Sequence, residues 1–330
     1  MTPVSDSSRE VSPPSCPVCD TEADGPIESF TTEEAAAHFC SPTRDQDRYG
    51  RLVNCIGDLW PEDTCEIYRC PSCGFGFGYP FVGGGEEFYG ILHEQMGYPR
   101  WTWDFDVALS VLEGERPGRI LDIGAGDGQF LSALDEEWSP HAVEASEATR
   151  VALEKQGIET YNSVQEVEAA DSFRCVTIFQ TLEHISEYEE VLQRCQFILE
   201  EKGTLIITVP KADEMFKQEK IVGWPDMPPN HINKWSPESL RKAIEQEGFE
   251  VFSLEEEPRS IDNVKSKLHM RLRKDAREPG SIASQVYRLP DRTFRKIGLA
   301  ALAPFALVRM VHELPYLFRG GAFCMAAKCK

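Results

Sequence analysis

The chain has 330 residues, of which 41% are apolar and 27% are charged, and its formal net charge is −21. This length is sufficient for one large α/β core and a smaller module. The strong negative charge repels phosphates and argues against nucleic acid as a partner. The charge is uneven, because Arg259 to Lys330 hold fifteen Lys or Arg against five Asp or Glu. An anionic partner therefore fits the C-terminal part, with a solvated basic face as the alternative.

The first residues, 1–14, have no apolar core of the signal-peptide type and are predicted to form a disordered lead-in. We therefore expect a cytoplasmic protein. In that compartment the eleven cysteines are metal ligands or buried thiols rather than disulfides.

Two close cysteine pairs, "CPVC" at 16–19 and "RCPSC" at 69–73, predict a small module over 15–82. Two such pairs supply four thiolates to a tetrahedral zinc ion, which leaves no open position and is therefore structural. Redox-active thiols or a chance pairing are the alternatives. Cys40, Cys55 and Cys65 could substitute as ligands, but they form no close pair. The predicted zinc ligands are Cys16, Cys19, Cys70 and Cys73.

The middle of the chain alternates short β-branched runs with helical patterns, which predicts a doubly wound parallel sheet of the Rossmann-like α/β class. One expected helix, "GQFLSALDEEW", buries Phe130, Leu131, Leu134 and Trp138 on one face. A later helix has Ser236 as its N-cap, Pro237 in its first turn and Gly248 at its end. The strands expected in chain order are 119–124, 141–146, 158–162, 173–180 and 203–210.

The stretch "RILDIGAGDG" places Gly124, Gly126 and Gly128 directly after a strand, where bare backbone can approach a ligand. A tight strand-to-helix turn without a ligand is the alternative. Glu144 ends the next strand, where a carboxylate can accept the ribose hydroxyls of an adenosine. The dinucleotide fingerprint needs a glycine at 129, but Gln129 stands there, and Asp127 disfavours a diphosphate. Asp122 suits the cationic amino group of S-adenosylmethionine better than it suits NAD.

Five segments together resemble the class I S-adenosylmethionine-dependent methyltransferases: "ILDIGAGDGQFL", "VEAS", "IFQTLEHI", "GTLIITVP" and "NHINKWSPESLRKAIEQEGFEV". The resemblance implies a core over 83–257 and a seven-stranded sheet whose last, antiparallel strand is "GAFCMAAKC". We expect that strand to lie at the sheet edge. Where many relatives have an aspartate before the fourth strand, this chain has Arg174 and Cys175. The cofactor contacts that the resemblance implies are Asp122, Gly124, Ala125, Gly126, Glu144, Ala145, Asn162, Ser163 and Gln180.

Methyl transfer to a weakly acidic acceptor requires a base. Glu183 and His184 follow the fourth strand, and His231 follows the fifth, so these three are the candidates, with packing roles as the alternative. The segment "GWPDMPPN" before His231 is expected to fold over the acceptor. Tyr89 and Tyr98 are further candidates to close over the cofactor.

A four-cysteine module ahead of such a core resembles the sugar C-methyltransferases and related enzymes of polysaccharide biosynthesis, in which the module helps to cover the acceptor site. We therefore expect a small or carrier-linked acceptor, most simply a nucleotide- or lipid-linked sugar. O-methylation of a quinone or another lipid, and a non-catalytic zinc-containing scaffold, are the alternatives.

The last zone, 258–330, is expected to be a basic helical insertion followed by the final strand. Its run "IGLAALAPFALVRMV", 297–311, is too short to span a bilayer. Its basic neighbours make peripheral membrane contact one interpretation, and a helical hairpin over the sheet or a dimer contact the other. These neighbours are Arg288, Arg292, Arg295 and Lys296.

Overall fold

The structure is a computed structural model of the chain. Of the predicted lead-in, residues 1–14, only Pro13 and Pro14 belong to the described part of the chain. The structure describes residues 13–93, 101–168, 173–222, 227–278 and 280–330.

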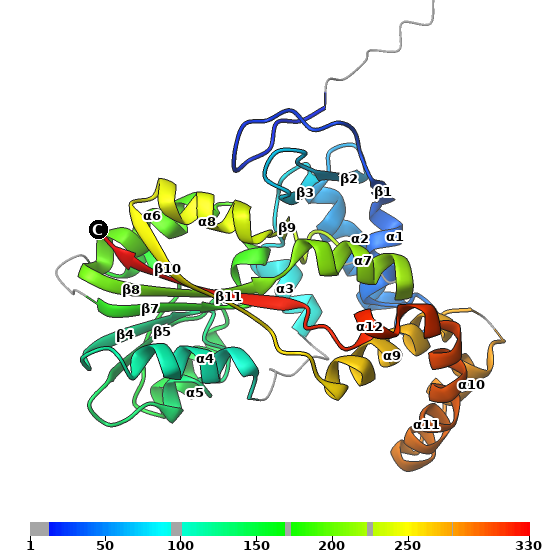
Figure 1. Cartoon of the computed structure of the whole chain (residues 1–330). Coiled ribbons are helices and arrows are strands. Elements are labelled where there is room, and N and C mark those ends of the chain that lie inside the picture. The colour runs from blue at the N-terminus through cyan, green and yellow to red at the C-terminus, as the bar shows by residue number, and fades with distance from the viewer. Residues whose placement is uncertain (1–12, 94–100, 169–172, 223–226, 279) are drawn as a thin grey trace, which may run out of the picture.

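A seven-stranded sheet forms the core (Figure 1). Its central strands are parallel, and one strand, β11, runs antiparallel to both of its neighbours. The predicted fold class and the antiparallel last strand are therefore confirmed. In spatial order the strands are β10 (Phe249–Glu256), β11 (Ala322–Cys329), β8 (Leu199–Pro210), β7 (Phe173–Phe179), β4 (Arg119–Ile123), β5 (Ser139–Val143) and β6 (Glu159–Tyr161).

The expectation that the last strand lies at the sheet edge was wrong. β10 pairs with the outer side of β11, and β11 is buried along nearly its whole length. A strand whose two faces are both apolar belongs in the interior of a sheet. The exposed charges of β10 identify β10 as the edge strand.

Helices cover both faces of this sheet, α6 and α8 on one side and α4 and α5 on the other (Figure 1). The alternation of side chains along each strand divides the core: Leu121 and Ile123 pack toward α6 and α8, whereas Ile120 packs toward α4. Ser236 caps α8 as predicted. The helices are α4 (Trp103–Leu112), α5 (Glu147–Glu154), α6 (Tyr188–Ile198) and α8 (Pro237–Gln246).

The helix predicted directly after the glycine loop does not form. Only a single 3₁₀ turn, η1 (Leu131–Ala133), lies between β4 and β5. Phe130, Leu131 and Trp138 are nevertheless buried, as predicted. Over so short a segment, helical spacing of apolar residues does not distinguish a helix from successive turns.

The N-terminal part forms a second, four-stranded sheet with the order β1-β2-β3-β9. Its fourth strand comes from residues 233–234, which follow the last parallel strand of the large sheet. The two sheets are therefore joined through the chain as well as by packing. The elements are β1 (Glu28–Thr31), α1 (Thr32–Phe39), α2 (Gln46–Leu59), β2 (Thr64–Arg69), β3 (Gly76–Tyr79), α3 (Glu86–His93) and β9 (Asn233–Lys234).

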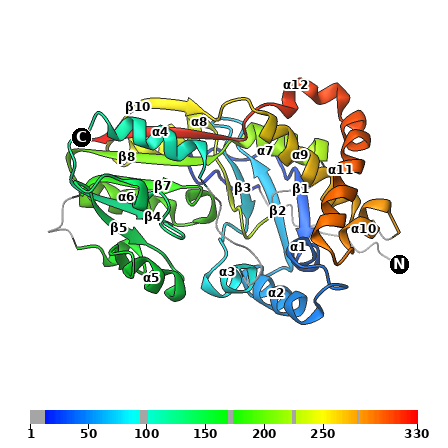
Figure 2. The ribbon, with the colours of Figure 1, turned by 90° about the horizontal axis from the view of Figure 1, so that it is seen from below.

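Helices fill the basic zone before β11. Seen from below in Figure 2, the small sheet lies between the large sheet and these helices. Both α7 (Ala212–Val222) and α11 pack against α9. The helices of this zone are α9 (Ile261–Asp275), α10 (Ile282–Tyr287), α11 (Arg292–Arg309), η4 (Val311–Glu313) and α12 (Leu314–Leu317).

Arg174, the departure noted in the sequence, belongs to an ion-pair network next to β7. It binds Glu115 at 2.5 Å and Glu200 at 3.0 Å. Glu115 also accepts hydrogen bonds from Lys328 of β11 and from Thr204 of β8. Arg174 therefore has a structural role that links neighbouring strands.

Candidate active site

One large cleft opens at the carboxyl ends of β4, β5 and β7 and has a volume of about 2300 Å³. Its first wall consists of the loops that follow these strands. The second wall comes from α1 and from the residues around α3, and the far end is closed by α9, α10 and α11. The carboxyl edge of a parallel sheet is where such folds bind ligands.

The backbone angles of the glycine loop, and contacts with other parts of the protein, both favour glycine. Gly124, Gly126 and Gly128 have φ values of 82°, 55° and 77°, which favour glycine. A Cβ at Gly124 would clash with the short side chain of Thr181, and one at Gly128 would press on the end of the Leu153 side chain. The positive φ angles and, at Gly124, this contact therefore favour glycine independently of any ligand. Gly124 and Gly126 line the cleft with Ala125 between them.

Asp122 lies in the cleft beside this loop and is 3% exposed. The hydroxyl group of Thr177 donates a hydrogen bond to its Oδ1 at 2.8 Å. Burial raises the pKa of Asp122 to about 7, and the charges of Asp104 and Glu144 act in the same direction. A buried carboxyl group in this state favours a ligand that carries a positive charge.

Asp104, at the start of α4, is a second buried carboxyl group of the cleft, which the sequence analysis missed. It is 2% exposed, and within the described residues its Oδ1 has no hydrogen-bond partner. Burial raises its pKa as well. In the sequence it looked like an ordinary acidic residue in the first turn of a helix. Together Asp104 and Asp122 fit the ammonium group that the resemblance implies for this end of the cleft.

Glu144 follows β5 and is held in a fixed position. Its two carboxylate oxygens accept hydrogen bonds from the backbone N–H groups of Gly126 and Ser146, both at 3.1 Å. Arg150 of α5, which the sequence analysis missed, donates to the carbonyl oxygens of Glu144 and Ala145 at 2.6 Å. It also donates to Asn162 Oδ1 at 2.9 Å. The arrangement fixes the residues expected to contact the ribose and the adenine.

The remaining expected cofactor residues differ in placement. Ala145 and Asn162 line the cleft, whereas Ser163 precedes η2 (Val164–Glu166) and is not among the described lining residues. Gln180 lines the cleft with a φ of 47°, a left-handed conformation that is rare for a residue other than glycine. Strained backbone of this kind concentrates at functional sites.

The three candidate bases come together, but they are not equivalent. Glu183, His184 and His231 each place one ligand-type atom within 4.8 Å of the others. His184 and His231 line the cleft with their ring centroids 4.6 Å apart. Glu183 is 1% exposed and lies behind the described lining. The histidines can therefore meet an acceptor, while Glu183 can stabilise a protonated imidazole.

The hydrogen bond between His184 Nδ1 and the carbonyl oxygen of Asn230, at 2.7 Å, defines the tautomer of this histidine. A carbonyl oxygen only accepts, so Nδ1 carries the hydrogen and Nε2 is the basic nitrogen. Tyr89 of α3 packs edge-on against the same imidazole and donates its hydroxyl to Asn230 at 3.2 Å. Tyr98 and residues 223–226 of the segment before His231 lie outside the described residues.

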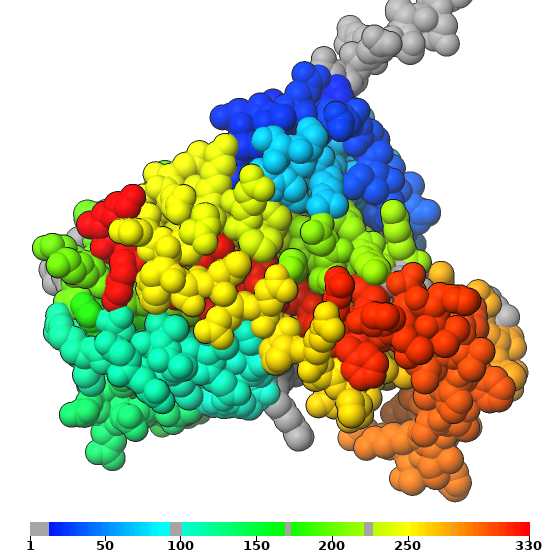
Figure 3. Space-filling model, in the orientation of Figure 1, coloured from blue at the N-terminus to red at the C-terminus, as the bar shows by residue number. Residues whose placement is uncertain are grey.

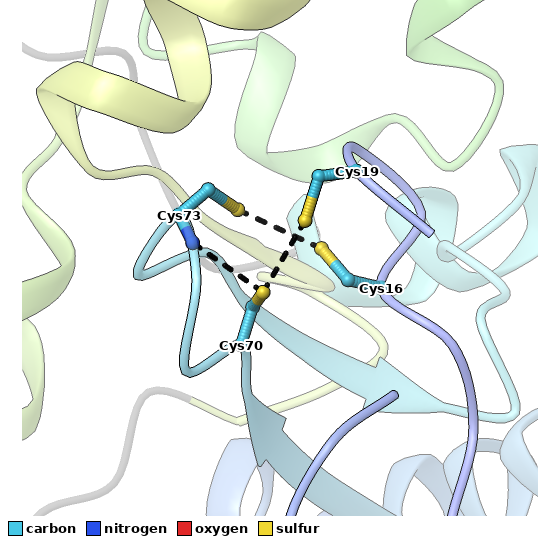
Figure 4. Close-up of side chains that lie close together, drawn as sticks. All are labelled: Cys16, Cys19, Cys70 and Cys73. Carbon is cyan, nitrogen blue, oxygen red and sulfur yellow. Dashed lines mark hydrogen bonds between the residues drawn. The ribbon is translucent and has the colours of Figure 1, made fainter. Parts of the chain in front are cut away.

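Among the described residues, two groups of side chains could hold a metal ion. Glu183, His184 and His231 offer one carboxylate oxygen and two imidazole nitrogens, a donor set that the sequence analysis did not consider as ligands. The other group is the predicted set of four cysteines, whose sulfur atoms converge (Figure 4).

The four sulfur atoms have the spacing that a tetrahedral zinc requires. Cys16 and Cys73 are 3.7 Å apart, and Cys19 and Cys70 are 3.4 Å apart. Zinc–sulfur bonds of about 2.3 Å give sulfur separations of about 3.8 Å. The hydrogen bond from Cys16 lowers the pKa of the Cys73 thiol, which favours a thiolate there. The donor set therefore fits zinc.

The cysteine cluster packs against the core and not against the cleft. Tyr188 of α6 donates to the carbonyl oxygen of Pro17 at 3.0 Å, and Ser236 donates to that of Cys73 at 2.7 Å. Within the described residues, none of the four cysteines lines the cleft. The loops around α1 and α3 do so instead. Cys40, Cys55 and Cys65 lie in a separate apolar cluster with α1, α2 and α3.

The far end of the cleft is basic. Its lining includes Arg273 of α9 and the side chains of Arg292, Arg295 and Lys296 from α11. Within the described part of the chain, these last three have no carboxylate partner. The cleft therefore has buried carboxyl groups beside the glycine loop and a group of cations from α9 and α11 at its far end.

Residues 105–254 match a protein family described as "Methyltransferase domain". No curated protein matches the chain. The enzyme class expected from the sequence, a methyltransferase, is therefore confirmed by the family match.

Many solved structures match the chain, and three of them are 13–19% identical to it. The [4+2]-cyclase SpnF is 19% identical, with 71% of this chain and 84% of that chain covered and a TM-score of 0.42. Coclaurine N-methyltransferase, bound to N-methylheliamine and SAH, is 13% identical, with 71% and 75% covered and a TM-score of 0.44. The YcgJ protein from Bacillus subtilis is 13% identical, with 68% and 95% covered and a TM-score of 0.40.

Proposed function

We propose that this chain transfers the methyl group of S-adenosylmethionine to an acceptor bound beside His184 and His231. One observation carries the proposal: a single cleft contains both the buried carboxyl groups of β4 and α4 and the histidine pair, His184 after β7 and His231 before β9. A cationic donor requires negative charge nearby, whereas a neutral acceptor that must lose a proton requires a base. The carboxyl groups meet the first requirement, and the histidines meet the second.

In this proposal each part of the cleft has one task. Asp122 and Asp104 bind the amino group of the donor, and Glu144 binds its ribose hydroxyls. When bound, S-adenosylmethionine supplies a methyl group on a positively charged sulfur atom. His184 or His231 removes the proton of the acceptor as the new bond forms. The buried Glu183 stabilises the resulting imidazolium, since an opposite charge nearby favours the protonated form.

The proposed acceptor is a sugar on a nucleotide or lipid carrier. The basic end of the cleft supports an anionic carrier, because Arg292, Arg295 and Lys296 are available to phosphate oxygens. The cleft volume of about 2300 Å³ exceeds the usual range for sites of small ligands. O-methylation of a quinone or another lipid is the second candidate, which the exposed apolar residues of α11 favour.

The test is label transfer from radioactive S-adenosylmethionine, run in parallel with nucleotide-diphosphate sugars and with a total lipid extract. We expect labelled product in one of the two arms. Of the two variants His184→Gln and His231→Gln, the one that lacks the base should form labelled product about 10²–10⁴-fold more slowly than the wild type. Binding of S-adenosylhomocysteine should change little in both variants. Unchanged rates in both would assign the histidines a packing role, and no label transfer in either arm would favour the scaffold alternative.

A structural zinc ion at Cys16, Cys19, Cys70 and Cys73 is part of the proposal. The sulfur spacing and the burial of three of the four cysteines support it. Four thiolate ligands leave no position for a substrate, so this ion would hold the fold without taking part in methyl transfer.

A further inference from the structure

Helix α11 exposes an apolar face that packs against nothing in the described chain. Phe294 and Ile297 are 66% and 60% exposed, and Phe305 and Val308 are both 71% exposed. Their spacing of 3, 8 and 3 residues places all four on one side of the helix. Ala306 is the only buried residue described in this 18-residue helix.

The opposite side of the same helix faces the cleft. Arg292, Arg295, Lys296 and Leu299 all line it. The N-terminal half of α11 therefore has cations on its inner side and large apolar side chains on its outer side. This division is typical of helices that lie in the surface layer of a membrane.

Neighbouring elements also have exposed apolar side chains. Ile282 of α10 is 67% exposed, Leu289 is 38% exposed, and Val311 of η4 is 44% exposed. Both elements contact α11. On soluble proteins, a large exposed apolar face such as that of α11 marks a surface that something else covers.

The shape of the molecule leaves this face accessible. In Figures 1 and 3, α10 and α11 stand out from the body of the molecule at the end remote from the large sheet. No single described helix is both long enough and apolar enough to cross a membrane. A pair, Arg292–Arg309 with Val311–Leu317, meets these criteria together, but it is bent by 73°. A helix lying flat in the membrane surface fits this bend without a span.

The charge distribution favours an anionic lipid surface over a second copy of the chain. Residues 259–330 contain fifteen basic and five acidic residues, so this zone has a net charge of about +10 (15 − 5), while the whole chain is at −21. Two copies that met through α11 would bring two such zones together, whereas anionic lipid headgroups attract one of them and repel the acidic remainder.

We infer that α11 docks the protein on an anionic bilayer, with Phe294, Ile297, Phe305 and Val308 inserted at the level of the headgroups. The helix then lies in the membrane plane, and the basic end of the cleft is held next to the lipid phosphates. This inference rests on the exposed apolar residues of α11 and its neighbours and on the charge of residues 259–330, and it does not depend on the proposed reaction.

The experiment is flotation of the full-length protein with vesicles of phosphatidylcholine alone and of phosphatidylcholine with phosphatidylglycerol. We expect binding only to the anionic vesicles, and weaker binding at high salt. The double variant Phe305→Asp/Val308→Asp should lower the partition coefficient by at least about tenfold. Phe197→Asp is the matched control, because Phe197 is 56% exposed on α6 and should bind as the wild type does.

Binding of S-adenosylhomocysteine, measured by thermal shift on the same samples, reports whether the variants are folded. It should be unchanged in all of them. The inference is overturned if the wild type does not float with anionic vesicles, or if the double variant floats as well as the wild type. It is equally overturned if light scattering shows a dimer that the double variant dissociates, since a second copy would then be the partner.

Discussion

At residue 122 the cleft holds a carboxyl group whose protonation decides what it can bind. Burial raises the pKa of Asp122 to about 7, above its ordinary value, so the empty folded protein favours the protonated form up to that pH. A bound ammonium group favours the ionised form instead. Ligand binding and proton release are therefore coupled at this position.

This coupling gives a first prediction. The affinity for S-adenosylhomocysteine should rise by up to about tenfold per pH unit between pH 6 and 7 and level off above pH 7. Asp122→Asn should remove the rise, because the amide does not titrate. Calorimetry in two buffers of different ionisation enthalpy measures both the affinity and the proton released. Asp127→Asn is the control, since Asp127 is an exposed residue of the same loop and should keep the wild-type pH profile.

The hydroxyl group of Thr177 provides a second, finer prediction. Its hydrogen bond lowers the pKa of Asp122 against the effect of burial. Thr177→Val has nearly the same volume and should shift the rise in affinity to higher pH. The same calorimetric titration checks it. A profile that coincides with that of the wild type would show that Thr177 does not control the ionisation of Asp122.

Residues that follow a strand could be predicted from the sequence, and residues that reach the cleft from helices could not. Asp122, Glu144 and Gln180 stand at strand ends, where the edge of a parallel sheet brings side chains together. Asp104 lies in the first turn of α4 and Arg150 lies within α5, and charged residues are common at such helix positions whatever their function. Only the packing of α4 and α5 against the sheet brings them to the same site.

At the scale of elements, six strands of the large sheet were predictable, because most of them are short apolar runs bounded by turns. The edge strand β10 and the four strands of the small sheet were not predicted. The 3₁₀ turn between β4 and β5 could not be predicted, because its apolar residues have the spacing of a helix although they lie in a connection of successive turns. The position of β11 at the interior of the sheet depends on β10, which is distant in the sequence and pairs with it only in the folded chain.

The ion-pair network next to β7 gives a prediction at this scale. Burial raises the pKa of Glu115, but the hydrogen bonds from Lys328 and Thr204 and the charge of Arg174 together lower it below its ordinary value. A lowered carboxyl pKa stabilises the folded state above the ordinary carboxyl pKa, and this stability is lost as the pH falls through the lowered value.

Glu115→Gln should therefore lower the free energy of unfolding at pH 7 by about 1–3 kcal/mol. The difference from the wild type should shrink below pH ~4.5. Urea unfolding at several pH values measures it. Glu245→Gln removes an exposed pair with Arg241 and should change the free energy by less than about 0.5 kcal/mol. A difference that persists at low pH would mean that the charge of Glu115 is not what stabilises the sheet.

At the scale of the whole molecule, the two sheets and the cysteine cluster form one structure. β9 completes the small sheet with residues that lie between β8 and β10 of the large sheet, and Cys16, Cys70 and Cys73 share an apolar core with Trp235. The cysteine pairs were visible in the sequence because of their spacing. The packing of these cysteines against α6 and α8 was not visible in the sequence, because it depends on contacts between distant parts of the chain.

This connection predicts how the protein responds to the loss of a zinc ligand. Cys70→Ser should abolish binding of the proposed zinc ion and lower the melting temperature of the whole chain in one transition. Cys65→Ser is the control: Cys65 is 0% exposed but lies in the other apolar cluster, so the variant should keep its metal. Metal analysis and calorimetric melting provide the two readouts. Retention of zinc in Cys70→Ser would show that the ligand set is wrong.

The central claim is that the cleft after β4 and β5 binds an adenosine with a cationic amino-acid tail, and the most direct measurement is calorimetric titration with S-adenosylhomocysteine and, separately, with NAD. We predict one S-adenosylhomocysteine bound per chain, a marked loss of affinity in Asp104→Asn, and no heat from NAD. Binding of NAD in this cleft, or no binding of S-adenosylhomocysteine by the folded protein, would contradict the claim.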